Sequence, residues 1–86
     1  MKIKLDFVLR EIGGEILLVP AGKAALDLNG MLTLNPMGAA LWNMLPEAAD
    51  EADLVQRVLD EYEVNADTAR ADVSAFLNRL QQLGIL

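Results

Sequence analysis

Two short dipeptides, Gly13-Gly14 and Asn29-Gly30, constrain the fold of this chain most strongly, because each lies between two apolar-rich runs. Glycine and asparagine tolerate the positive φ angles that the tight turns of two-residue hairpins require. The first dipeptide predicts a hairpin of strands 7–12 and 15–19, with the pairs Ile12–Glu15, Arg10–Leu17 and Val8–Val19. The second dipeptide predicts a shorter hairpin of strands 25–28 and 31–34.

Both faces of the first predicted hairpin carry apolar side chains. One face collects Phe7, Leu9, Ile16 and Leu18, and we expect it to pack on the helices that follow. On the other face Val8, Leu17 and Val19 surround Arg10. This second face should be an exposed apolar patch unless another part of the molecule covers it.

The second half of the chain contains three amphipathic segments with helix start and stop signals. Asn35-Pro36 predicts the start of a helix that runs to about residue 45, where Pro46 ends it. Gly38 inside this helix costs about 1 kcal/mol relative to Ala, which indicates that another backbone approaches closely there. Asp50 and Asn65 are the predicted caps of the next two helices, and the last helix should end at Gly84. The two apolar residues that follow, Ile85 and Leu86, should dock on the domain instead of fraying.

The order of these elements predicts an α+β fold, with N-terminal antiparallel β-hairpins followed by a three-helix bundle. We expect a single domain over residues 1–86, since a chain of this length has room for no more than one core.

Histidine and cysteine are both absent from the 86 residues. Their absence removes the thiol nucleophile, the disulfide, the commonest metal ligands and the commonest general base. A carrier protein would need an exposed serine at the start of a helix to hold a phosphopantetheine arm. The only serine here, Ser74, falls in the middle of the third predicted helix, so its position does not fit a carrier protein. The acids Asp50, Glu51 and Asp53 are explained by helix capping. The sequence therefore predicts no catalytic residue, no metal site and no cofactor, and favours binding over catalysis.

The acidic side chains are concentrated in one segment. The chain carries 7 basic and 13 acidic residues, a net charge of −6, and residues 47–63 contain seven of the acids but only one base. The simpler interpretation of this segment is a solvated helix face, and the alternative is a docking surface. This charge distribution argues against nucleic acid as a ligand, because it leaves no place for a basic stripe. No apolar run approaches the ~20 residues of a membrane span and no signal peptide is evident, so we expect a cytoplasmic protein that does not bind membranes.

The last predicted strand, residues 31–34, is a candidate binding edge. It contains no Lys, Glu or Pro, the residues that commonly protect the edge of a sheet from pairing. An extended peptide could therefore add to it as a further strand. The alternatives are that the edge is short, covered by a loop, or paired in a homodimer.

Several stretches resemble one known family. Residues 34–42, Leu-Asn-Pro-Met-Gly-Ala-Ala-Leu-Trp, are similar to the L-N-x-x-G-x-x-[IL]-W stretch of the PqqD-like proteins, which are recognition elements for ribosomally synthesised, post-translationally modified peptides (RiPPs). Glu61-Tyr62 followed by Val64 resembles the family's E-Y-x-V. The end of the chain, from Asp72-Val73 to Gly84-Ile85-Leu86, resembles its D-V-x-x-F-L-x-x-L-x-x-x-G-[LI]-L.

This resemblance implies a winged-helix-like domain that captures the leader region of a precursor peptide between its last strand and its third helix. The domain would present the peptide to a separate modifying enzyme, often a radical SAM maturase. Carried over by position, the peptide-binding residues would be Met31, Leu32, Thr33 and Leu34 on the strand and Asp72, Phe76 and Arg79 on the helix.

Simpler interpretations of these residues remain open from the sequence. Phe76 and Trp42 could be core residues, and Asp72 with Arg79 could form a surface ion pair. For the whole chain, the alternatives are a winged-helix-like DNA-binding or regulatory module, or an interaction domain that dimerises through its apolar sheet face. The DNA-binding alternative requires a basic recognition helix, whereas the arginines here are scattered and offset by acids.

Overall fold

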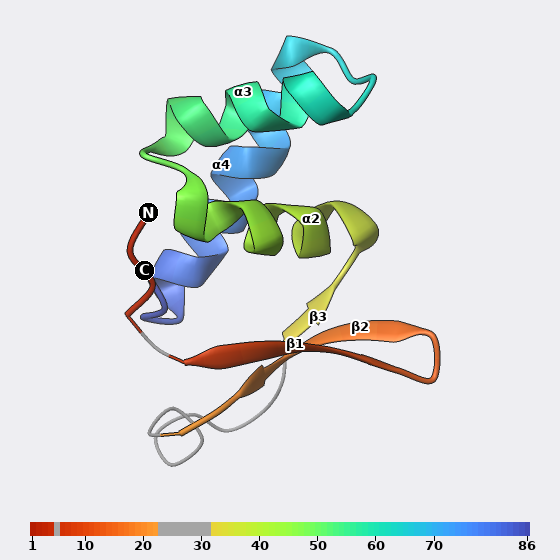
Figure 1. The fold of residues 1–86 in the computed structure, drawn as a ribbon, viewed down its shortest axis with the longest axis vertical. Helices are drawn as coiled ribbons and strands as arrows, with labels where there is room; N and C mark the ends of the chain where they lie inside the picture. The colour runs from red at the N-terminus through yellow and green to blue at the C-terminus, as the bar shows by residue number, and fades with distance from the viewer. Residues whose placement is uncertain (5, 23–31) are drawn as a thin grey trace.

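The computed structural model describes residues 1–4, 6–22 and 32–86. Strands precede helices in the order β1 (Phe7–Ile12), β2 (Glu15–Pro20), β3 (Leu32–Leu34), α2 (Pro36–Met44), the 3₁₀ turn η1 (Leu45–Glu47), α3 (Glu51–Glu61) and α4 (Ala66–Gln82) (Figure 1). The α+β class predicted from the sequence is confirmed. The predicted strand 25–28, the Asn29-Gly30 turn and Met31 lie outside the described residues.

The three strands form one antiparallel sheet in the order β1-β2-β3. The turn between β1 and β2 has positive φ angles at both glycines, 59° at Gly13 and 84° at Gly14, as a tight hairpin turn of this type requires. Three strand pairs were predicted from the two-residue turn, and the register contains all of them: Val8–Val19, Arg10–Leu17 and Ile12–Glu15. The turn chemistry thus determines which side chains face the helices.

One of the two sheet faces differs from the sequence-based expectation. Leu17, predicted to be part of an exposed patch, retains only 8% of its surface exposure. It lies on the central strand, opposite Arg10 of β1 and Thr33 of β3, so neighbours flank it on both sides. Val8 is exposed as expected, and Ile12 is exposed as well; both lie on β1 at the edge of the sheet.

The junction between β3 and α2 is a single capped corner. The Asn35 side-chain oxygen accepts a hydrogen bond of 2.7 Å from the Gly38 amide, and Pro36 occupies the first helical turn. α3 and α4 begin in the same way, at the predicted caps Asp50 and Asn65. These caps satisfy backbone amides that would otherwise lack partners in the first turn.

Replacing Asn35 with Ala should destabilise the fold by about 1 kcal/mol, because the Gly38 amide loses its partner. For a domain of this size, that loss lowers the melting temperature by about 4–8 °C. Thermal unfolding followed by circular dichroism provides the measurement. Asn43→Ala is the matched control, since Asn43 is exposed on the same helix, and its melting temperature should stay near that of the wild type. An equal effect of both substitutions would contradict the capping role.

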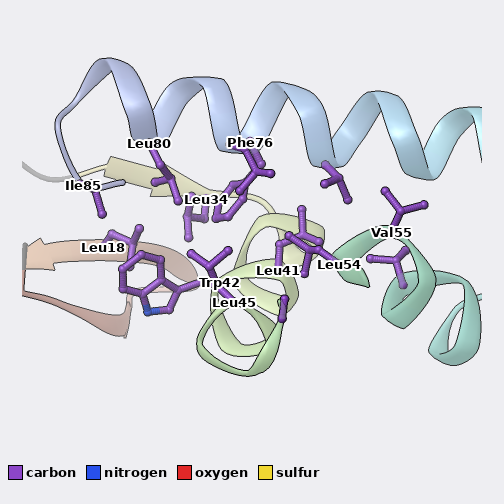
Figure 2. Packing of buried hydrophobic residues seen from close by; sticks show 14 of the residues in the cluster. Leu18, Leu34, Leu41, Trp42, Leu45, Leu54, Val55, Phe76, Leu80 and Ile85 are labelled. Carbon is purple, nitrogen blue, oxygen red and sulfur yellow. The ribbon is translucent and has the colours of Figure 1, made fainter. Parts of the chain in front are cut away.

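The hydrophobic core lies between the sheet and the helices (Figure 2). Every described element except β1 contributes at least one side chain with little or no exposure, including Leu18 of β2, Leu41 of α2, Leu54 of α3 and Leu80 of α4. Ile85, just after α4, is also fully buried, and its carbonyl accepts a 2.6 Å hydrogen bond from the Lys4 amide. The predicted docking of the last residues is confirmed.

Arg57 joins the η1 turn to α3. Its guanidinium donates to the Glu47 carbonyl at 3.0 Å and to the Asp53 carboxylate at 3.2 Å. The Ala49 amide also donates to Asp53, at 2.9 Å. The hydrogen bond from Ala49, followed by that from Arg57, holds the pKa of the Asp53 carboxyl below its ordinary value.

Because the pKa of Asp53 is lower in the folded state than in the unfolded state, its stabilising contribution is present at neutral pH and lost on acidification. We expect the stability difference between the wild type and Asp53→Asn to shrink as the pH falls from about 5 to about 2. Urea unfolding at a series of pH values measures it. Asp60→Asn alters an exposed carboxylate of the same helix and should not reproduce this pH-dependent difference.

No helix in the described part of the chain is both long and apolar enough to cross a membrane.

Candidate functional site

A cavity of about 220 Å³ lies between β3, the beginning of α2 and one flank of α4. Its lining combines the strand, both helices and their corner: Thr33, Leu34, Asn35, Met37, Gly38, Leu41, Asp72, Ala75, Phe76 and Arg79. β3 is an outer strand that pairs with β2, and no described strand occupies its other edge. The cavity is therefore next to a strand edge that can accept a further strand.

The structure brings together five of the seven residues that the sequence singled out. Thr33 and Leu34 line the cavity from β3, and Asp72, Phe76 and Arg79 line it from α4. Leu32 does not line the cavity; its side chain is 8% exposed and belongs to the core. Met31 lies outside the described residues.

The α4 wall follows from helical spacing. Asp72, Phe76 and Arg79 are separated by four and three residues, so they lie along the same flank of the helix. Ala75 lies between them and is exposed. Because Ala75 has only a methyl group, this part of the wall is recessed.

Phe76 combines the two roles that the sequence left open. Its side chain is 9% exposed and belongs to the core cluster, yet it also lines the cavity. Figure 2 shows it beside Leu34. Trp42, by contrast, is a core residue that does not line the cavity.

The α2 wall contains Met37, Gly38 and Leu41. A Cβ atom at Gly38 would lie 3.2 Å from the side-chain oxygen of Asn35 and 3.4 Å from the Leu34 side chain. The close approach predicted at Gly38 is thus present, but side chains make it, and the expectation of a neighbouring backbone was wrong. The glycine allows the first turn of α2 to lie tightly against the end of β3.

Met37, Leu41 and Ala75 were not identified as site residues from the sequence. Met37 and Leu41 have the spacing of core residues, and nothing in the sequence separates the cavity wall from the rest of that stripe. Ala75 could have been found, since it lies three residues after Asp72 and four before Arg79.

The cavity carries one charge of each sign. Asp72 and Arg79 are both exposed. The ion pairs between described residues join Arg57 to Glu47 and Asp53, and Arg70 to Asp67, so Asp72 and Arg79 are not an ion pair. Their charges are available to a bound molecule.

A second hollow of about 530 Å³ lies on the opposite flank of α4, against α3. Ala52, Val55 and Leu59 of α3 and Arg70 and Ser74 of α4 are among its lining residues. It borders no strand edge. No group of three or more metal-ligating side chains occurs in the described ranges, here or elsewhere.

A protein-family comparison tests the resemblance seen in the sequence. Residues 15–86 match the family model described as coenzyme PQQ synthesis protein D (PqqD). The chain is a member of the PqqD family. The resemblance of its motifs to PqqD-like proteins is thereby confirmed, and the matched region includes β3, α2 and α4, the three elements that form the cavity.

Two solved structures have the same fold as this PqqD-family chain. One is described as TbiB1 in complex with the TbiA(beta) leader peptide; it is 26% identical, with a TM-score of 0.71, and the match covers 100% of this chain and 94% of that one. The other is a lasso peptide synthetase B1 complexed with the leader peptide, 20% identical, with a TM-score of 0.69 and coverage of 98% and 93%. No curated protein matches the sequence.

Proposed function

We propose that this PqqD-family chain binds the leader region of a precursor peptide as an additional strand next to β3. The observation that carries the proposal is the position of the cavity, which lies between the outer edge of β3 and the Asp72–Arg79 flank of α4. Strand addition uses main-chain hydrogen bonds for affinity and side-chain pockets for specificity. An edge strand next to a cavity provides both.

The proposed binding residues are Leu32, Thr33 and Leu34 of β3 with Met31, which precedes them in the sequence, and Asp72, Phe76 and Arg79 of α4. Leu32 would contribute through its backbone, since its side chain is buried in the core. The two structural neighbours are complexes with leader peptides, which supports a leader peptide as the ligand by analogy.

In this proposal the chain holds the peptide, and a separate modifying enzyme, such as a radical SAM maturase, carries the reactive groups. The composition supports a binding role, because the chain has neither histidine nor cysteine. DNA binding is not favoured, because the exposed charges of α4 include Asp67 and Asp72 as well as Arg70 and Arg79 and form no basic stripe.

A titration tests the proposal. The probes are synthetic peptides with the N-terminal sequences of short open reading frames adjacent to the gene, added to isotopically labelled protein. We expect saturable amide shifts at Thr33, Leu34 and along α4 from Asp72 to Arg79. Absence of binding by every probe, or shifts confined to α3 and the β1–β2 turn, would overturn the proposal.

A further inference from the structure

The two charged residues of the cavity lie at different points along α4. Asp72 and Arg79 are seven residues apart, which corresponds to about 10.5 Å along a helix axis. Both are exposed, both line the cavity, and neither forms an ion pair with another described residue. A ligand extended along the cavity would meet a negative charge near one end and a positive charge near the other.

The direction of this charge separation relative to β3 follows from the core. In Figure 2, Leu80 lies over Leu18 while Phe76 lies beside Leu34. Leu18 pairs with Leu32, at the beginning of β3. α4 therefore runs opposite to β3, which places Arg79 towards the beginning of the strand and Asp72 towards its end, where α2 starts.

We infer that the cavity selects its peptide by the order of charges: a basic residue, an apolar residue and an acidic residue on alternate positions. This inference rests on the proposed function. The basic side chain would face Asp72, the apolar one would enter the cavity beside Phe76 and Leu41, and the acidic one would face Arg79. Side chains on one face of a strand recur every two residues, about 6.6 Å, so the two outer positions are about 13 Å apart. This spacing exceeds the separation of about 10.5 Å between Asp72 and Arg79 along α4, and the long side chain of Arg79 can reach across the remaining distance.

The order along the peptide depends on strand direction. Both strand pairs of this sheet are antiparallel, and antiparallel pairing is slightly more stable per residue. An antiparallel peptide would run from the end of β3 to its beginning, and hence from Asp72 to Arg79. The basic residue therefore precedes the acidic residue.

Selection from a display library of random ten-residue peptides tests the inference. We expect the wild type to enrich the pattern basic-x-apolar-x-acidic, and the double variant Asp72→Arg, Arg79→Asp to enrich the reverse order. Each single charge reversal should weaken a selected peptide about five- to tenfold at low salt, with a smaller effect at high salt. Because both side chains are exposed, the variants should retain the melting temperature of the wild type.

The outcomes separate this inference from the proposed function. If peptides with an apolar residue are enriched in no particular charge order, or if the double variant keeps the wild-type order, the inference is wrong and strand addition stands. Enrichment of the acidic residue first by the wild type would also overturn it. If no peptide is selected by the wild type, both the inference and the proposed function fail.

Discussion

Replacing Ala75 with Trp should weaken peptide binding by about 100-fold or more. Ala75 lines the cavity between β3 and α4 and is exposed, so its replacement adds a bulky side chain without disturbing the core. The indole would fill the space that the proposed peptide side chain requires, next to Phe76 and Leu41. Calorimetric titration of the best-binding leader peptide measures the effect, and an unchanged melting temperature shows that the fold is intact.

Gln81→Trp is the control for this substitution. Gln81 is exposed on the same helix, six residues further along and about 120° around the helix axis from Ala75, and it does not line the cavity. Its replacement should leave the affinity within about twofold. If the two Trp variants bind equally well, the peptide does not use this cavity.

The largest expected effect on stability is that of Leu80→Ala. Leu80 has no exposed surface and lies in the core that joins α4 to the sheet. Truncation of a buried leucine costs about 2–5 kcal/mol, because apolar contacts are lost and a cavity is left. A domain of this length is stable by roughly 4–13 kcal/mol in total, so the variant should be partly unfolded at 37 °C or melt at least about 10 °C lower.

Leu83→Ala provides the comparison within the same region, because the Leu83 side chain is 39% exposed. Its cost should stay below about 1 kcal/mol in urea unfolding. Similar losses for Leu80 and Leu83 would contradict the packing of α4 described above.

The backbone of this fold follows closely from local sequence signals. Gly13-Gly14 predicted the β1–β2 register, and Asn35, Asp50 and Asn65 predicted the three helix starts, because turns and caps depend on a few adjacent residues. The shape of the cavity was less predictable. The cavity depends on how α2 and α4 meet β3. Two residues of its α2 wall, Met37 and Leu41, have the periodicity of ordinary core residues.

Two errors have the same physical origin. Leu17 was expected to be exposed and Gly38 was expected to meet a backbone, yet Leu17 is buried by neighbouring strands and Gly38 meets side chains. Both properties depend on tertiary neighbours that no local pattern specifies. Asp72, Phe76 and Arg79 were named through the resemblance to PqqD-like proteins, and their helical spacing explains why they lie on one flank of α4.

The most direct test of strand addition is a scan of the bound peptide in which one backbone amide at a time is N-methylated. Along a strand, only every second amide points towards its neighbour, so methylation should weaken binding at alternate positions. We expect losses of about tenfold or more at those positions and little change between them, because a lost hydrogen bond and a clash with β3 together exceed 1.4 kcal/mol. A loss at consecutive positions, or no loss at any, would show that the peptide does not bind as a strand on β3.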